Sequence, residues 1–217
     1  MKIIDLTVPL NEKLQCYPTD PPFKRSWHVE YDKEGSNLSR LDMGAHAGTH
    51  VDAPLHFLRN GISLTEMSVE IFLGNAIAID SPKSSGENVM PEDLSGADVR
   101  AGDIVLFHTG WEKRASSPMF FEGEWPGIDP ATIDILISKK VKGIGGDIAS
   151  ADSPMAIAAG AAAHKKAAEA GIPIYEALIN MDKVIGKRFF FIALPLKLEG
   201  GEASPVRAIA ILDFEIA

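Results

Sequence analysis

Short runs of apolar or alternating residues recur along the chain, separated by turn residues, and they predict β-strands. The runs cover residues 2–8, 24–31, 38–45, 75–79, 103–108, 141–145, 189–194 and 206–212. Proline, glycine and asparagine separate them: Pro9 ends the first run, and residues 32–37 and 60–61 have the composition of turns. The pattern predicts a protein in which strands are the main regular elements.

Three segments instead have the composition of helices, and they cover residues 66–73, 130–140 and 156–170. Asp129 is a good N-cap for the second segment, because an acid there accepts backbone N–H groups and Pro130 suits the first helical position. The third segment is rich in alanine, the best helix former. Gly74 and Gly171 stand where the first and third segments would end. A helix followed directly by the apolar residues 141–145 indicates an α/β fold.

Two long stretches lack any regular period. Residues 11–22 include Tyr17 and three prolines, and this segment is too rich in proline for a helix or a strand. Residues 109–128 carry Trp111 and Trp125 among several prolines and glycines. A connection of this length in a compact domain is often a lid or a binding loop, and its two tryptophans would equally suit an interface.

The composition is that of an ordinary soluble globular protein, because 46% of the residues are hydrophobic and 24% are charged. A length of 217 residues suits one domain with a sizeable core, spanning residues 1–217. Lysine and arginine number 21 against 30 acids, which gives a net charge of −9, and no long basic run occurs. A nucleic acid or an anionic membrane surface is therefore not an expected partner.

Cys16 is the only cysteine, so an internal disulfide is excluded, which suits a reducing cytoplasm. The first residues reach an acid at Asp5 and lack the apolar core of a signal peptide. No stretch has the length of a membrane span. These features predict a cytoplasmic protein.

Residues 46–56 concentrate the side chains that bind transition metals. They read His-Ala-Gly-Thr-His-Val-Asp-Ala-Pro-Leu-His and hold three of the six histidines. Glycine, β-branched residues and proline disfavour a helix there, whereas an extended strand would point His46, His50 and Asp52 to one face. Gly48 would share that face and leave room for an ion. Three such ligands with open positions beside them are typical of a catalytic metal site.

This stretch resembles the HxGTHxDxPxH motif of the cyclase family of metal-dependent hydrolases, and every fixed position of that motif is present. The segment from His164 to Glu176 resembles the second metal-binding segment of the same family, although His164 by itself reads as a solvated helix residue. The pieces Leu-Pro-Leu-Lys and Ser-Pro-Val-Arg-Ala near the C-terminus also match the family.

The resemblance implies a site for two divalent ions. Its expected ligands are His46, His50, Asp52, His164 and Glu176. Asp52 would lie between the ions; zinc is the expected metal, and manganese accepts the same ligands. His56, just past the ligand strand, is expected to move a proton in catalysis. In the family an aromatic side chain, usually tryptophan, lines the substrate pocket at the position of Tyr17. His28 and His108 are left out of the ligand set.

The function implied by the resemblance is hydrolysis of an amide bond by a metal-activated water. The expected activity is that of a kynurenine formamidase, which converts N-formyl-L-kynurenine to L-kynurenine and formate in tryptophan degradation. Another amide or lactam hydrolase of the family, such as one that opens isatin, is the first alternative. A non-catalytic protein that binds a metal or a small molecule is the alternative of a different class.

The resemblance also implies a fold and an assembly. The expected fold is a single α/β domain with a mixed β-sheet core and flanking helices, of the swivelling β/β/α type found in the cyclase family. The expected assembly is a homo-oligomer, most simply a dimer with two-fold symmetry.

Overall fold

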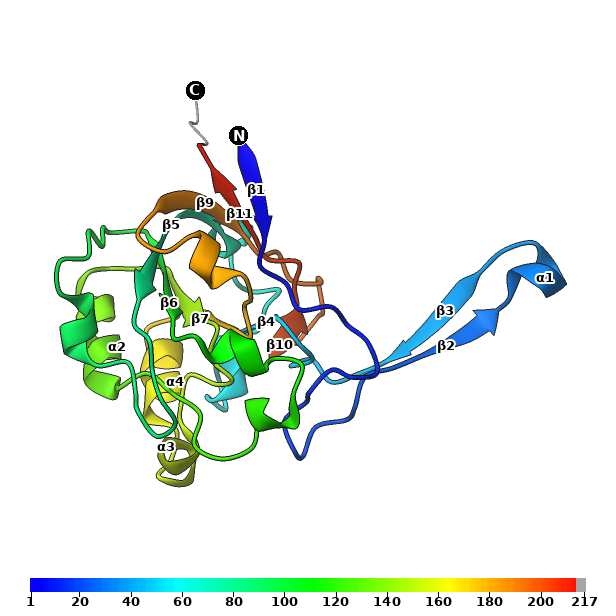
Figure 1. Cartoon of the computed structure of the whole chain (residues 1–217), viewed down its shortest axis with the longest axis horizontal. Coiled ribbons are helices and arrows are strands. Elements are labelled where there is room, and N and C mark those ends of the chain that lie inside the picture. Colours follow the sequence, from blue (N-terminus) through cyan, green and yellow to red (C-terminus); the bar gives the residue numbers. More distant parts are fainter. Residues whose placement is uncertain (214–217) are drawn as a thin grey trace.

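A nine-stranded mixed sheet forms the body of the protein in the computed structural model, which describes residues 1–213 (Figure 1). Its strands are β1 (Lys2–Asp5), β4 (His50–Asp52), β5 (Leu73–Asp80), β6 (Ile104–His108), β7 (Gly143–Gly146), β8 (Ile174–Glu176), β9 (Arg188–Ile192), β10 (Ala203–Pro205) and β11 (Ile209–Leu212). They lie in the order β1-β11-β9-β5-β6-β7-β8-β4-β10. The strands from β5 to β8 are parallel neighbours, and the other pairs are antiparallel.

Side chains alternate across the sheet and form a hydrophobic core on each face. On the central strand β6, Ile104 and Leu106 pack into one core, whereas Val105 and Phe107 pack into the other. Helices α2 (Pro130–Ser138) and α4 (Ala162–Glu169) cover the second face. These four side chains of β6 are fully buried, and the burial of each stabilises the folded state by about 1.5–3 kcal/mol. The expected α/β fold with a mixed sheet and flanking helices is confirmed.

Strand β7 contains three glycines, and the neighbouring strands β6 and β8 come very close to two of them. A Cβ atom on Gly145 would lie 2.1 Å from the carbonyl oxygen of Tyr175, and one on Gly146 would lie 2.2 Å from that of Phe107. The absence of a side chain at both positions lets β6 and β8 pack tightly against β7.

The helix predicted from Asp129 is confirmed. The Asp129 side chain accepts a hydrogen bond from the backbone N–H of Ala131 at 2.8 Å, and Pro130 occupies the first helical position. The helix buries Ile133 and Leu136 against the sheet.

Two other helix predictions are wrong. The alanine-rich run breaks into α3 (Pro154–Ala158) and α4, because Gly160 and Ala161 adopt φ angles of 112° and 54°. Residues 66–73 hold only a short 3-10 helix at Val69–Phe72, after which the chain enters β5. Gly74 lies inside that strand and does not end a helix, because β5 pairs with β9 from Leu73 onward.

Short helical turns connect the remaining strands. The 3-10 helices are η1 (Pro54–His56), η3 (Pro91–Leu94), η4 (Trp111–Arg114), η5 (Pro118–Phe120) and η6 (Met181–Lys183). None of the helices in residues 1–213 combines the length and apolar character that a membrane crossing requires.

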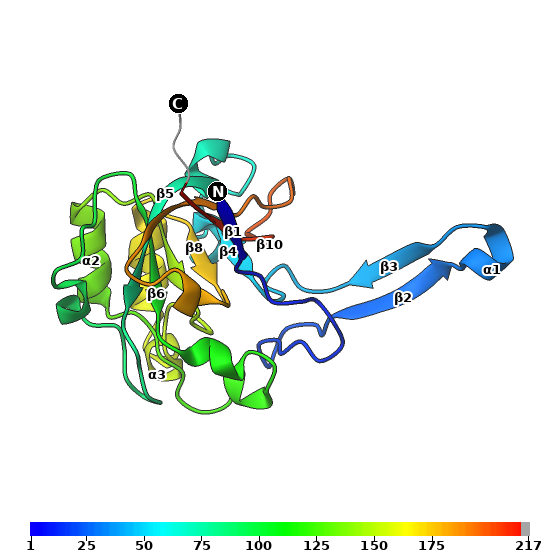
Figure 2. The same cartoon turned by 45° about the horizontal axis from the view of Figure 1, so that its top comes forward.

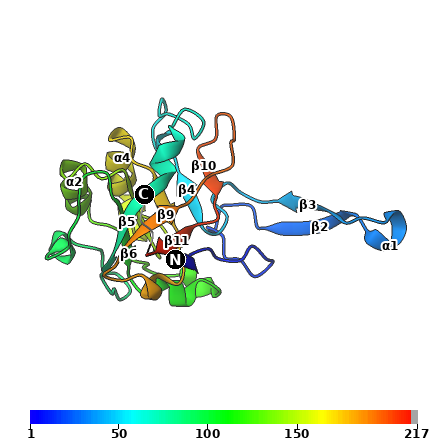
Figure 3. The same cartoon turned by 90° about the horizontal axis from the view of Figure 1, so that it is seen from above.

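A two-stranded arm projects from the body of the protein, as Figures 1, 2 and 3 show from three sides. It consists of β2 (Lys24–Val29), the four-residue helix α1 (Tyr31–Glu34) at its tip and β3 (Leu38–Asp42). The two strands confirm the runs predicted there, but neither contains a buried residue. An isolated two-stranded hairpin is marginally stable in water, so the arm lacks the packing that usually supports such an element.

Candidate metal centre

The local structure of the histidine-rich stretch differs from the extended strand predicted for it. Strand β4 covers only His50–Asp52, and the chain reaches it through a bend at residues 45–49. Gly48 has a φ angle of 67°, which glycine adopts without strain. A Cβ atom there would point at Val8 and Leu10. The prediction that Gly48 leaves room for an ion is therefore wrong; it allows the bend that returns His46 to the site.

Strand β4 is held in place by pairing on both sides. His50 is opposite Glu176 of β8 and Pro205 of β10. The buried Thr49 hydroxyl donates to the carbonyl of Ala177 at 2.7 Å and accepts from the N–H of Val8 at 2.9 Å. These bonds join the motif to the segment that follows β1 and to the residue after β8.

The five residues predicted as ligands lie together. His46 Nδ1 is 2.9 Å and His50 Nε2 is 3.4 Å from Asp52 Oδ1. On the other side, His164 Nε2 is 3.7 Å from Asp52 Oδ2 and 3.2 Å from Glu176 Oε1. The two oxygens of Asp52 therefore face different histidines, and Glu176 Oε2 is 3.4 Å from His50 Nε2.

The cluster meets the requirements of a cation site. Among residues 1–213, His50 Nε2 and both carboxylate oxygens of Asp52 are buried without a hydrogen-bond partner. Buried polar atoms without a partner are costly, and a bound cation would satisfy these three. Nδ1 of His50 is 2.8 Å from the Gly48 carbonyl oxygen, and Nδ1 of His164 is 2.6 Å from Asp152 Oδ2, so each histidine turns its Nε2 toward the cluster. The residues present thus fit the metal that their chemistry implies.

Electrostatic interactions among the side chains of the cluster are strong. Burial lowers the pKa of His50, but the negative charges of Asp52 and Glu176 outweigh it and raise that pKa to about 9. Burial raises the pKa of Glu176, but its interactions with His164 and His50 outweigh burial and lower that pKa to about 2. In the absence of metal, protons therefore occupy positions that a divalent cation would take.

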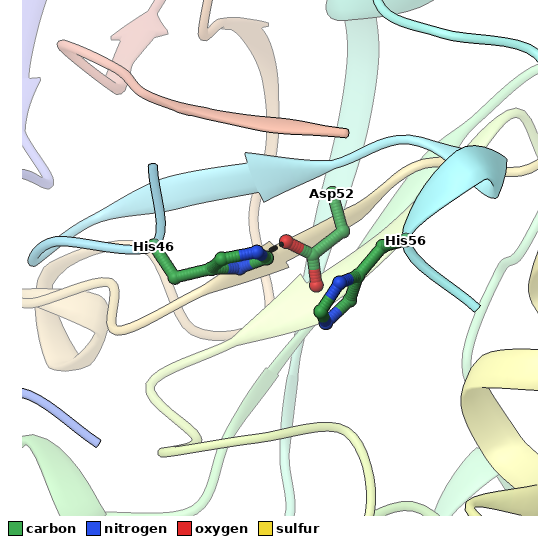
Figure 4. Close-up of side chains that lie close together, drawn as sticks. All are labelled: His46, Asp52 and His56. Carbon is green, nitrogen blue, oxygen red and sulfur yellow. Dashed lines mark ion pairs between the residues drawn. The ribbon is translucent and has the colours of Figure 1, made fainter. Parts of the chain in front are cut away.

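His56 lies at the end of η1 beside this cluster. Figure 4 shows His46 and His56 approaching the carboxylate of Asp52. The ring centroid of His56 is 4.2 Å from that of His46 and 6.0 Å from that of His164. Desolvation lowers the pKa of His56 despite the nearby charge of Asp52. This neutral imidazole is suited to proton transfer, although His46, Asp52 and His56 also offer atoms close enough to share an ion. Its catalytic role remains a prediction.

A cavity of about 260 Å³ opens beside the cluster. It is lined by the aromatic rings of Tyr17, Phe57 and Phe121, as well as by Asp20 and the predicted ligands other than Asp52. A turn from Tyr17 to Asp20, closed by a 2.8 Å hydrogen bond between their backbone groups, brings both side chains to the cavity. Tyr17 therefore lines a cavity beside the cluster, and its role in binding substrate, which the resemblance implies, stays a prediction. No pattern in the sequence pointed to Phe57 or Phe121.

The tryptophans of residues 109–128 are structural. Trp111 and Trp125 are only 2% and 4% exposed, and each donates its indole N–H to a backbone carbonyl. They therefore do not offer the interface that their segment suggested. Phe121 from the same segment packs edge-to-face against Tyr17, with ring centroids 5.9 Å apart, and so supports the cavity wall.

The two histidines left out of the ligand set lie outside the cluster. His28 is exposed on β2 of the arm. His108 ends β6, with Nδ1 2.8 Å from Asp80 Oδ1. By contrast, Asp152 was missed, although it is fully buried and contacts His164 directly.

Comparisons with known proteins agree with this arrangement. The family model for cyclases matches residues 4–153. The kynurenine formamidase of Salinibacter ruber is 33% identical over 215 residues, which cover 96% of this chain and 97% of that protein. The kynurenine formamidase of Bacillus thuringiensis strain Al Hakam is 34% identical over 213 residues, with 95% of each chain covered.

Solved structures share the fold. Isatin hydrolase A from Ralstonia solanacearum superimposes with a TM-score of 0.89 at 26% identity, covering 96% of this chain and 91% of that one. A protein from Bacillus stearothermophilus described as a "predicted metal-dependent hydrolase" gives a TM-score of 0.79 at 28% identity, covering 96% and 97%.

The fold, the ligand cluster and these relatives define a metal-dependent hydrolase. Within that class, the chain belongs to the cyclase family, as the family model and the relatives that match almost its whole length demonstrate.

Proposed function

We propose that this protein is an amidohydrolase that converts N-formyl-L-kynurenine to L-kynurenine and formate. The observation that carries the proposal is the position of the ligand cluster, which opens directly into an aromatic-lined cavity. Such a cavity suits an aryl amide, whose ring packs against aromatic side chains while its carbonyl reaches the cluster. Near full-length similarity to kynurenine formamidases supports the same substrate. Residues 1–217 would act as one hydrolase domain in the cytoplasm.

The proposed cofactor is a pair of divalent ions, with zinc preferred and manganese as the alternative. One ion would be held by His46 and His50 and the other by His164 and Glu176, with Asp52 between them. The proximity of one Asp52 oxygen to His46 and of the other to His164 supports this assignment. The chemistry that ions supply at such a site is polarisation of the amide carbonyl and a lowered pKa for water.

His56 is the proposed proton carrier. It lies beside the cluster and lines the cavity, so it can accept a proton as water attacks the carbonyl. It can then deliver a proton to the leaving nitrogen, which becomes the amine of the product. Tyr17 would hold the aryl ring during both steps, since its side chain lines the same cavity.

A hydrolysis panel tests the proposed substrate. Purified protein with measured metal content would be incubated with N-formyl-L-kynurenine, isatin and formanilide, each with and without a chelator. We expect the highest kcat/KM for N-formyl-L-kynurenine, and loss of that activity with the chelator. Preference for isatin would favour the second candidate, a lactam hydrolase, which the similarity to isatin hydrolase A supports. Metal binding without turnover of any substrate would favour a binding protein.

The proposed assembly is a homodimer in which the arm contacts a second copy. Trp27, Tyr31, Leu38 and Leu41 of the arm are each about half exposed or more. A cavity of about 500 Å³ at the root of the arm is lined by Leu41 of the arm and by Leu10 and other residues of the body. Because arm and cavity are adjacent, one two-fold axis can place each arm against the partner's cavity.

A further inference from the structure

The carboxylate of Asp152 makes three contacts with the first turn of α4. Its Oδ1 accepts the backbone N–H of Ala163 at 3.1 Å, and its Oδ2 accepts that of His164 at 2.9 Å. The same Oδ2 is 2.6 Å from Nδ1 of the His164 ring. Asp152 is fully buried, and its own carbonyl accepts the indole N–H of Trp125.

These contacts explain why the alanine-rich run breaks. Ala161, the residue before α4, has no side chain that can accept a hydrogen bond, and its φ angle of 54° starts a new helix there. Asp152 supplies the missing cap from outside the helix, because Ala163 and His164 are the second and third helical residues, whose N–H groups need an acceptor. A continuous helix would bury those N–H groups within its own ladder and leave the carboxylate without them.

The contact with the ring selects one tautomer of His164. A carboxylate accepts hydrogen bonds, so Nδ1 carries a hydrogen, and Nε2 is the nitrogen left to offer its lone pair to a bound cation. Nε2 points toward the cluster, where it is 3.2 Å from Glu176 Oε1 and 3.7 Å from Asp52 Oδ2. Phe57 stacks on the ring with centroids 4.2 Å apart, which limits rotation of the ring.

We propose that Asp152 is a positioning residue that fixes the tautomer and orientation of His164 for metal binding. One carboxylate would thereby cap α4 and hold a metal ligand at the same time. The inference rests on the proposed function through the role of His164 as a ligand. Loss of such an outer carboxylate typically weakens metal affinity about 10–100-fold.

The substitution Asp152→Asn separates the two roles. Asparagine keeps one oxygen that can accept the N–H of Ala163, so α4 should keep its start. Loss of the acceptor for the N–H of His164 should lower the metal-free melting temperature by only a few degrees. The amide, however, can turn its NH₂ toward Nδ1, which favours the tautomer with hydrogen on Nε2. We therefore expect zinc affinity, measured by competition with a chromophoric chelator, to fall about 10–100-fold. The visible absorption of the Co²⁺-loaded protein should change as well.

Asp129→Asn is the matched control, because Asp129 caps α2 and contacts none of the predicted ligands. It should leave zinc affinity and the Co²⁺ spectrum unchanged. Equal zinc affinity for Asp152→Asn and the unmodified protein would overturn the inference. His164→Ala tests the underlying ligand role separately: if it keeps full zinc binding, the proposed ligand set is wrong, whatever Asp152 does.

A measurement on the unmodified chain covers the case in which Asp152→Asn does not fold. Imidazole ¹⁵N NMR of the zinc-loaded protein reports which nitrogen of His164 carries hydrogen. The inference predicts hydrogen on Nδ1, and hydrogen on Nε2 would overturn it.

Discussion

His50 lies directly opposite Glu176 across the antiparallel pair of β4 and β8, with Nε2 3.4 Å from Glu176 Oε2. Their positions in the sequence are far apart, and the register of two three-residue strands brings them together. Both side chains are almost completely buried. The pair therefore joins the two halves of the ligand cluster.

The charge of this pair makes metal binding depend on pH. The negative charges around His50 outweigh its burial and raise its pKa to about 9, above its ordinary value of 6.5. Below that pKa a proton must leave before a cation binds, so zinc affinity should rise with pH from about 7 to 9, by up to about tenfold per unit. Chelator competition at several pH values measures this. Affinity that is constant over the range would contradict the prediction.

Two histidine substitutions should separate catalysis from metal binding. His56→Ala should keep its metal and lower kcat by about 10²–10⁴-fold, because it removes the proposed proton carrier. His50→Ala should lose metal and activity together, because it removes a proposed ligand. Metal analysis and formate release on the same samples compare them. Complete loss of metal in His56→Ala would show that His56 is a ligand. Full turnover by His56→Ala would show that another group transfers the proton.

Asp20 should distinguish substrates by charge. Asp20 lines the cavity, and among residues 1–213 no lysine or arginine lines it, so the Asp20 carboxylate suits the ammonium group of N-formyl-L-kynurenine. Asp20→Asn should raise KM for that substrate by up to about fivefold, since a partly exposed ion pair is worth about 0.2–1 kcal/mol. Formanilide, which has no ammonium group, is the control and should show an unchanged KM. An equal change for both substrates would refute the charge-based role.

The exposed apolar residues of the arm should control assembly. The double substitution Trp27→Ser and Leu38→Ser removes two of them and should convert a dimer to a monomer, as measured by light scattering at micromolar concentration. Met155→Ser, at an exposed position on α3, should leave the dimer intact. A monomer for the unmodified protein would exclude the proposed assembly.

The sequence predicted most of the strands because apolar alternation is a local signal. It also predicted α2, whose cap and proline lie next to each other at Asp129 and Pro130. It did not predict the break at Gly160, because the acceptor that makes a new helix start favourable is Asp152, which lies before the predicted helix. Propensity favours a continuous helix there, and a buried tertiary contact overrides it.

Some residues of the site could likewise be predicted from the sequence, whereas others could not. The spacing of His46, His50 and Asp52 indicated a metal site, although the chain reaches it by a bend at Gly48 and not by strand alternation. His164 was identified only through resemblance, since its own surroundings in the sequence suggest a solvated helix residue. Side chains such as Phe57 carry no sequence signal for the cavity wall, because only the fold determines that they face it.

Zinc titration of chelator-treated protein, with formate release from N-formyl-L-kynurenine as the readout, tests whether hydrolysis depends on two bound ions. We expect no activity without metal and a rise with added zinc that ends at two ions per chain. Full activity in the metal-free protein, or no formate at any zinc loading, would contradict this expectation.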